Sequence, residues 1–198
     1  MIQYTSYVLK PQSKKIIICM SSTHWHFLWQ RPQQIMSRLS REYNILFVDP
    51  PYPLPESEIV REKNGKIKNA FRLNSINPSL KVLSSFQVAE QGTAPEGNAL
   101  SACNITWLKE QISQSLQNLG WFTAPLLWIY NPQAVVMVGQ LGECGVIYDC
   151  VDSFASFSWA DPRTEQWETE LNRKADVIFA SANKLYLKWR AGGKAVYL

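Results

Sequence analysis

The chain has 198 residues, of which 46% are hydrophobic and 18% are charged, with a formal net charge of +4. This length and composition suit one globular domain and exclude a disordered tail. The charge is too small for a nucleic-acid-binding surface, and no apolar run approaches the roughly 18 residues of a membrane span. The four cysteines lack a CxxC spacing, which argues against a zinc site or a disulfide framework and suits a reducing cytosol.

The first elements in chain order form a strand–helix–strand unit. Ile16–Met20 is an apolar run with three consecutive isoleucines, which is typical of a strand buried on both faces. Residues 31–43 have helical spacing, with Pro32 at a first helical position and Asn44 as a C-terminal stop. Residues 45–48 form a second buried strand. Two strands joined by a helix within about thirty residues predict parallel pairing.

The middle of the chain predicts a hairpin inserted into this pattern. Asn64-Gly65 is a strong turn signal, and apolar and polar residues alternate behind it, so we interpret residues 58–73 as a β-hairpin. Residues 81–84 are expected to form a further short strand. Residues 88–98 are rich in glycine, proline and polar residues, which indicates a loop.

Helices and strands alternate again in the second half. Apolar residues recur at helical spacing between positions 105 and 119, and Gly120 ends that helix. The elements expected after it are a strand at 125–130, a short helix from Asn131 to Gly142, a strand at Gly145–Cys150, a helix at 163–175, a strand at Val177–Ala180, a helix at 182–190 and a strand at 195–198. The whole pattern predicts an α/β fold with a Rossmann-like, doubly wound, mostly parallel sheet and a β-hairpin insertion.

The candidate site lies in the loops that follow the predicted strands. Open parallel sheets bind their ligands at the carboxyl ends of the strands. Here those loops gather both histidines of the chain with aromatic, amide and acidic side chains. The candidate substrate-binding residues are His24, Trp25, His26, Trp29, Arg31, Asn131 and Phe154, and the candidate catalytic residues are Asp149 and Asp152.

Each candidate also has a structural interpretation. The histidines could be ordinary polar loop residues that donate a hydrogen bond to a nearby carbonyl group. At least two of the three aromatic residues that alternate in the first loop could pack beneath a helix. Asp149 and Asp152 could cap the following segment or bind Arg31. A cation in a first helical turn opposes the helix dipole, which suggests that Arg31 has a specific partner.

Several cofactor-binding motifs are absent from the sequence. The turn after the first strand, SSTHWHFLWQ, contains no GxGxxG, which argues against tight binding of NAD or FAD. The chain also lacks the P-loop motif, the GxSxG elbow of hydrolases and any metal-ligand spacing. We therefore expect neither an organic cofactor nor a bound metal.

Four sequence segments carry a resemblance to a known family. They are residues 29–34 (WQRPQQ), 45–49 (ILFVD), 146–152 (VIYDCVD) and 175–181 (ADVIFAS). In this order, they resemble the N-terminal domain of bacterial GT-B-fold glycosyltransferases. The likeness is greatest to the group that builds cell-surface polysaccharides, such as teichuronic-acid-type enzymes, and it covers nearly the whole chain except the hairpin and the loop at 88–98.

The resemblance implies a two-domain enzyme whose N-terminal half holds the acceptor while a C-terminal half binds a nucleotide-sugar donor. Residues 1–198 would then be a single acceptor-side domain that ends before the donor-binding domain, and the fragment alone would be inactive. The implied partners are the nucleotide sugar and a saccharide or lipid-linked acceptor, with no nucleic acid. We expect a cytoplasmic protein, either free or peripheral at the inner face of the cell membrane.

Sugar transfer with inversion needs a base for the acceptor hydroxyl, and a positioned base contributes about 10²–10⁴-fold. The candidates are Asp152, Asp149, His24 and His26. We favour Asp152, because it follows a strand end in a loop rich in aromatic residues. A retaining enzyme would need no such base. Two other functions stay open, namely a non-catalytic Rossmann-like binding module and half of a GT-B-like sugar-nucleotide epimerase.

Overall fold

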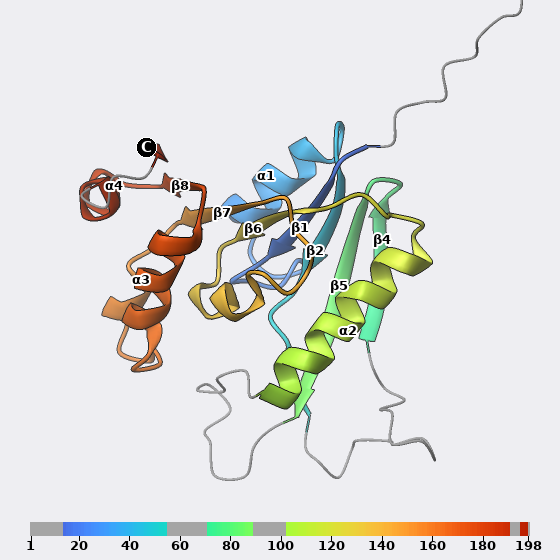
Figure 1. Cartoon of the computed structure of the whole chain (residues 1–198), viewed down its shortest axis with the longest axis horizontal. Coiled ribbons are helices and arrows are strands. Elements are labelled where there is room, and N and C mark those ends of the chain that lie inside the picture. The colour runs from blue at the N-terminus through green and yellow to red at the C-terminus, as the bar shows by residue number, and fades with distance from the viewer. Residues whose placement is uncertain (1–13, 55–70, 89–101, 191–194, 198) are drawn as a thin grey trace, which may run out of the picture.

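The computed structural model describes residues 14–54, 71–88, 102–190 and 195–197. These residues form one nine-stranded sheet with helices on both of its faces (Figure 1). The strands are β1 (Ile16–Met20), β2 (Asn44–Val48), β3 (Tyr52–Leu54), β4 (Phe71–Asn77), β5 (Leu80–Val88), β6 (Leu126–Ile129), β7 (Gly145–Cys150), β8 (Val177–Ala180) and β9 (Ala195–Tyr197). The α-helices are α1 (Arg31–Leu39), α2 (Ala102–Asn118), α3 (Thr164–Lys174) and α4 (Asn183–Arg190), and two 3₁₀ helices are η2 (Pro132–Met137) and η3 (Phe154–Ser156).

The sheet is parallel except for one strand, and its strand order reverses at β1. The order is β3-β5-β2-β1-β6-β7-β8-β9, and β4 pairs with β5 in the antiparallel sense. The chain builds outward from β1 through β2 to β5, crosses back through α2, and then builds outward on the other side from β6 to β9. Cys19 at the centre therefore lies between Phe47 and Trp128. This order confirms the predicted doubly wound α/β fold and puts the topological switch point between β1 and β6.

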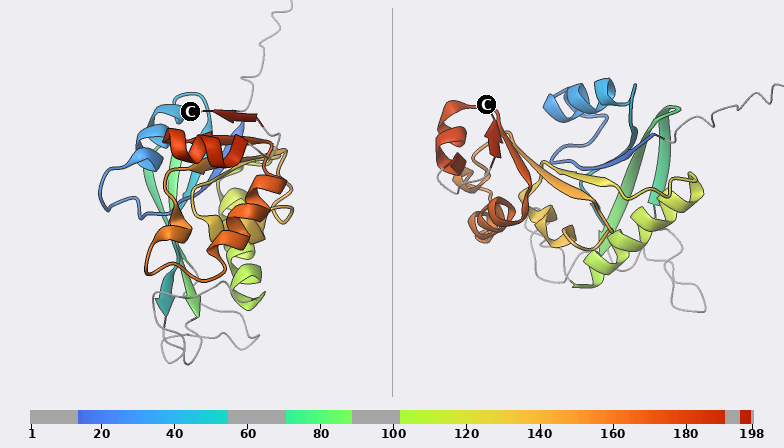
Figure 2. Two further views of the ribbon diagram at one scale, coloured as in Figure 1. Left: turned by 90° about the vertical axis from the view of Figure 1, so that its left-hand side faces the viewer. Right: turned by 45° about the horizontal axis from the view of Figure 1, so that its top comes forward.

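The two faces of the sheet carry separate apolar clusters. Helix α1 packs on one face, where Met36 joins a cluster with Cys19 and Phe47. Helices α2, α3 and α4 contribute to the cluster on the opposite face, which includes Ile112 and Leu171. The right-hand view of Figure 2 shows α1 and α2 on opposite sides of the sheet. Because both faces are covered, all five residues of β1 are buried, as a continuous apolar run predicts.

Helix α1 is shorter than its sequence pattern predicts. It ends at Leu39, and residues 40–43 form turns in place of the expected last turn of helix. Asn44 does not stop the helix, because it is the first residue of β2 and its backbone N–H donates to the carbonyl oxygen of Lys15 at 2.9 Å. Asn44, which the sequence predicted to end the helix, is therefore hydrogen-bonded within the sheet.

A β-hairpin is present in the described residues that follow the predicted hairpin turn. The predicted turn at Asn64-Gly65 falls outside the described residues, as does most of the loop at 88–98. The described hairpin joins β4 to β5, and its turn contains Pro78 and Ser79. The side-chain oxygen of Asn77 accepts a hydrogen bond from the backbone N–H of Ser79 at 2.9 Å, which fixes this turn. The expected short strand at 81–84 is the central part of β5.

Strand β3 continues the line of β2 along β5. Val48 of β2 lies opposite Leu83, and Tyr52 of β3 lies opposite Phe86 on the same neighbour. The intervening Asp49-Pro50-Pro51 interrupts the pairing, because proline has no N–H to donate to the ladder. As a result, Tyr52 projects past the carboxyl end of β1, where the loop after β1 begins.

Candidate functional site

The loops after β1, β2, β6 and β7 meet at one edge of the sheet. The backbone N–H of Ser21, which follows β1, donates to Val48 at the end of β2 at 3.1 Å. On the other side, the N–H of Tyr130 after β6 donates to Met20 at 2.9 Å. These bonds align the strand ends in register, so the loops that hold the candidate residues lie at the same carboxyl edge, next to the switch point.

Asp49 forms the first polar centre of this edge. It is buried directly after β2, and its carboxylate accepts hydrogen bonds from the backbone N–H of Trp25 at 2.8 Å and from the hydroxyl of Ser84 at 3.0 Å. The Nδ1 atom of His24 lies 3.8 Å from the second carboxylate oxygen. The imidazole stacks on the ring of Tyr52, with centroids 4.3 Å apart. The carboxylate thus faces one nitrogen of a half-buried imidazole that an aromatic ring holds in place.

Asp149 and Arg31 form the second polar centre. The side-chain Nε of Arg31 donates to both carboxylate oxygens of Asp149, at 2.9 and 3.2 Å, and the indole N–H of Trp128 donates to one of them at 3.3 Å. Asp149 is fully buried, while Arg31 is 41% exposed. Burial raises the pKa of Asp149, and the guanidinium of Arg31 opposes that rise. Arg31 therefore has the specific partner that its place in a helical first turn suggests.

The same burial affects the neighbouring Tyr130. Its pKa is raised by burial and by the carboxylate of Asp149, so the phenol keeps its proton. Asp149 is thus surrounded by Arg31, Trp128 and Tyr130. Because its carboxylate is fully buried, Asp149 does not present a free carboxylate to solvent, while the guanidinium of Arg31 is partly exposed.

Asp152 lies in a third group, in the loop after β7. Its side chain is exposed, and Phe154 two residues later is half-buried in η3. Further along, Phe157 and Trp159 stack on each other with centroids 4.8 Å apart. Asp152 thus lies in a loop with aromatic residues and has an exposed side chain, and no described contact joins it to either histidine. Its role as a base stays a prediction.

The aromatic residues of the loop after β1 divide between the interior and the surface. Trp25 is 5% exposed and packs edge-on against Phe47, whereas Trp29 is 53% exposed and touches Trp25 at its edge. Phe27 is also exposed, so only one of the three aromatic residues is buried, where at least two were expected. His26 is exposed. In this structure Trp25 supports the loop from below, and the other side chains are presented to solvent.

Asn131 has a structural position at the start of η2. Its side-chain oxygen accepts a hydrogen bond from the backbone N–H of Gln133 at 3.1 Å, which caps the 3₁₀ helix. With Asp49 and Ser21 it also lines a small hollow of about 20 Å³ at the ends of β1 and β2. A hollow of that size holds about one water molecule.

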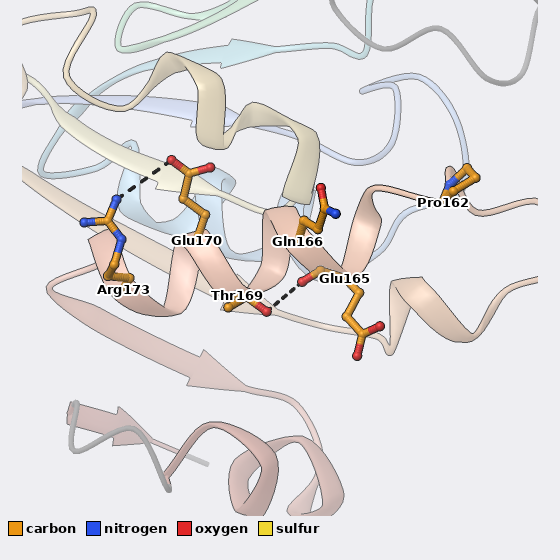
Figure 3. A pocket seen from close by; sticks show the side chains of 6 residues that line it. All are labelled: Pro162, Glu165, Gln166, Thr169, Glu170 and Arg173. Carbon is orange, nitrogen blue, oxygen red and sulfur yellow. Dashed lines mark hydrogen bonds and ion pairs between the residues drawn. The ribbon is translucent and has the colours of Figure 1, made fainter.

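A larger hollow lies on the surface of α3 and is drawn in Figure 3. It measures about 610 Å³ and is lined by Pro162 and by residues of α3, namely Glu165, Gln166, Thr169, Glu170 and Arg173. The guanidinium of Arg173 lies 4.0 Å from the carboxylate of Glu170. None of the candidate site residues lines this hollow, so we do not assign the chemistry to it.

Sequence reasoning missed the residues that hold the loop after β1. The side-chain amide of the buried Gln33 donates to the carbonyl oxygens of His24 and Leu28 at 3.2 and 3.1 Å and accepts from the N–H of Gln30 at 3.1 Å. The Gln30/Gln33 spacing is that of a capping box, which was the available signal. Asp49 and Tyr52 follow the second strand in sequence, but nothing in the sequence pairs them with His24.

The fold is shared with solved structures of very low sequence identity. The chain matches two structures of sucrose-phosphate synthase from Thermosynechococcus elongatus. In one, the TM-score is 0.54 at 11% identity over 93% of this chain and 87% of that chain. In the other, it is 0.59 at 10% identity over 93% of this chain and 47% of that chain. The chain thus spans about half the length of the second structure.

A UDP-N-acetylglucosamine 2-epimerase from Rickettsia bellii matches with a TM-score of 0.47, at 10% identity over 94% of this chain and 44% of that chain. No protein-family model matches the chain, and no curated protein matches it. At these identities the likeness concerns the fold. The chain has the mixed α/β architecture of a Rossmann-like half of a GT-B fold.

Proposed function

We propose that the chain is the acceptor-binding half of a glycosyltransferase, which moves a sugar from a nucleotide-sugar donor to a polysaccharide or lipid-linked acceptor. The observation that carries the proposal is the His24–Asp49 pair, which lies at the carboxyl edge of the parallel sheet beside its switch point. Open α/β sheets bind their ligands there. The four segments that resemble bacterial cell-surface polysaccharide enzymes give the proposal its substrate class.

His24 is the base that the geometry favours for an inverting transfer. A sugar hydroxyl is a weak nucleophile, and a base within hydrogen-bond reach removes its proton as the new bond forms. The carboxylate of Asp49 lies 3.8 Å from Nδ1 of this imidazole. Asp149 is a poor base because Arg31 and Trp128 occupy its oxygens in the interior. In a retaining transfer, His24 would bind the acceptor without acting as a base.

The remaining candidate residues are assigned roles in binding the acceptor or as a second candidate base. Asp152, which the sequence favoured as the base, becomes the second candidate, because its carboxylate is exposed on the same edge but has no described partner that would assist proton transfer. Trp29 and Phe154 would contact the acceptor. Arg31 would bind an acidic group through the end of its guanidinium, since its Nε makes the hydrogen bonds to Asp149. A second half of the protein would bind the donor, and a peripheral position at the membrane would bring a lipid-linked acceptor within reach.

An assay of UDP release from nucleotide-sugar donors, catalysed by the full-length protein, tests the proposal. The full-length enzyme is given UDP-glucose, UDP-galactose or UDP-N-acetylglucosamine together with lipid and polysaccharide extracts, and the released UDP is measured. We expect His24→Asn to lower kcat by about 10²-fold or more, because the base is lost. The matched control is His26→Asn, an exposed histidine of the same loop, which should stay within about threefold.

Three outcomes would contradict this assignment. A large loss in Asp152→Asn with an active His24→Asn variant would move the base to Asp152. Conversion of UDP-N-acetylglucosamine in the absence of any acceptor would indicate an epimerase. Failure of the protein to release UDP from any nucleotide sugar, with correct folding verified by circular dichroism, would remove the transferase proposal itself.

A further inference from the structure

The loop after β7 holds an aromatic surface that no described part of the chain covers. Trp159 is 62% exposed, and its ring lies parallel to that of Phe157, with an interplanar angle of 9° and centroids 4.8 Å apart. Phe157 in turn contacts Phe154 edge-on. One side of the Trp159 indole is thus occupied by Phe157, which orients the other side toward solvent.

Hydrogen bonds within the loop fix this arrangement before any ligand binds. The backbone N–H of Phe157 donates to Phe154 at 3.2 Å, and that of Ala160 donates to Phe157 at 3.0 Å, so Trp159 lies at the corner of a closed turn. The turn ends in a clamp in which Arg163 donates to both carboxylate oxygens of Asp161 at 2.9 Å. A fixed ring loses little conformational entropy on binding, which favours weak ligands such as sugars.

The chemistry of this surface fits the C–H face of a pyranose ring. The face of an indole carries negative charge density, and the axial C–H groups of a pyranose carry the complementary positive density. Hydroxyl and carboxylate groups of the same loop, those of Ser158 and Asp152, are exposed and able to bind sugar hydroxyls. The loop's cation, Arg163, is bound to Asp161. The loop therefore offers an aromatic face and acceptors of hydrogen bonds, with its positive charge already neutralised.

We propose that Trp159 is a stacking platform for an uncharged sugar residue of the acceptor, and that Asp152, the exposed carboxylate of the same loop, accepts hydrogen bonds from hydroxyl groups of the bound glycan. This inference rests on the proposed function and narrows its acceptor to a glycan whose unit at this position is neutral. Within the loop after β7 a uronate would meet the exposed carboxylate of Asp152, while the loop's cation, Arg163, is already bound to Asp161, and like charges at close range repel. The partly exposed Arg31 belongs to α1 and is held on Asp149, three residues before Asp152, so we assign it to an acidic group elsewhere on the acceptor.

The proposal is tested by ¹⁹F NMR spectroscopy of fluorine-labelled Trp159. The full-length protein is labelled with 5-fluorotryptophan, and the resonance that disappears in Trp159→Phe is assigned to Trp159. Cellotetraose, chitotetraose and α-1,6-mannotetraose are the neutral probes, and tetragalacturonate is the charged probe. We expect at least one neutral probe to shift the Trp159 resonance, and tetragalacturonate to bind roughly tenfold more weakly or not at all.

Substitutions at Trp159 then test whether its ring contributes to the affinity for the neutral probe. Trp159→Ala should weaken binding of that neutral probe roughly tenfold, and Trp159→Phe should lose less because it keeps an aromatic face. The control is Phe122→Ala, which removes a 79% exposed ring from the connection between α2 and β6 and should leave the affinity unchanged. Because both side chains are exposed, the midpoint of thermal unfolding should not move in either variant.

The outcomes separate this inference from the proposed function. A neutral probe that binds without shifting the Trp159 resonance overturns the platform and leaves the transferase proposal intact, as does a probe affinity that Trp159→Ala does not change. Tighter binding of tetragalacturonate than of every neutral probe overturns the assignment of an uncharged acceptor. A shifted Trp159 resonance in a protein that releases no UDP from any nucleotide sugar supports a glycan-binding platform while the transferase proposal fails.

Discussion

At the scale of single residues, two carboxylates on one sheet edge receive different environments from their neighbours. Asp49 accepts from a backbone N–H and a hydroxyl and faces an imidazole, whereas Asp149 is bound by a guanidinium. A specific partner for Arg31 was predictable from the sequence, because a cation in the first turn of a helix opposes the helix dipole. The burial of Trp25 was not, because Trp25 and Trp29 look alike in sequence and only tertiary packing against Phe47 separates them.

Replacement of Arg31 by methionine tests the role of the ion pair in stability. The variant leaves the buried carboxylate of Asp149 without its cation, and we expect a loss of about 2 kcal/mol in the free energy of unfolding at neutral pH. The partial exposure of Arg31 keeps this value low, because water screens the guanidinium. Urea unfolding monitored by circular dichroism measures the change.

The penalty should depend on pH with a definite sign. Burial raises the pKa of Asp149 in the folded state above its unfolded value, so the folded protein binds more protons in the interval between the two values. Stability therefore falls as pH rises through that interval. Loss of the guanidinium raises the folded pKa further and extends the interval toward neutral pH, so the penalty of Arg31→Met is small in acid and complete at neutral pH. A penalty equal at pH 4 and pH 7, or unchanged in an Asp149→Asn background, would show that the charge pair is not its cause.

At the scale of elements, the buried strands were predictable from the sequence. The ends of elements that are set by hydrogen bonds to distant segments were not. The apolar runs at Gly145–Cys150 and Val177–Ala180 have the bounds that the sequence predicts, because flanking turns and burial on both faces leave little choice. The end of α1 was missed, whereas the predicted hairpin turn lies outside the described residues. Asn44 has the local chemistry of a helix stop, but its N–H donates to the carbonyl oxygen of Lys15, the residue before β1, which no local pattern reveals.

Helices α3 and α4 are joined to β7 by a buried polar network. The carboxylate of Glu168 on α3 is fully buried, accepts from the hydroxyl of Tyr148 at 3.2 Å and binds the ammonium of Lys188 on α4 at 2.9 Å. We expect Glu168→Ala to lower the free energy of unfolding by about 2–4 kcal/mol, because it opens a cavity and leaves the Tyr148 hydroxyl unpaired. Thermal or urea unfolding measures the loss.

The control lies two residues further along the same helix. Glu170 binds Lys174 at 2.7 Å on the surface, and Glu170→Ala should cost less than about 0.5 kcal/mol because water screens an exposed pair. Equal losses in the two variants would mean that the helix surface, and not the buried network, sets the stability of this layer.

At the scale of the whole molecule, the described residues form one sheet with a helical layer on each face, and loops and the short 3₁₀ helix η3 follow the strands at its carboxyl edge. Among the described residues, no helix combines the length and apolarity that a membrane crossing requires. The doubly wound, mostly parallel sheet was predictable from the alternation of helices and strands. The geometry of the candidate site was not predictable in this way. The distances between His24 and Asp49 and between Arg31 and Asp149 depend on loops whose paths are fixed by buried groups such as Gln33.

The shape of this edge predicts that residues 1–198 alone do not transfer sugar. A site for a ligand of nucleotide-sugar size usually encloses about 300–1,000 Å³, while the hollow beside Asp49 and Asn131 holds about 20 Å³. The larger hollow on α3 lies away from every candidate site residue, and its one cationic lining residue, Arg173, is 4.0 Å from the carboxylate of Glu170, so it offers a diphosphate no unpaired cation. We therefore expect the isolated chain to bind UDP-glucose with a Kd weaker than about 1 mM and to release no UDP with any acceptor, as calorimetry and a UDP-release assay would measure. A Kd in the micromolar range, or robust turnover by the isolated chain, would show that the described edge already contains a donor site and that no second half is needed for transfer.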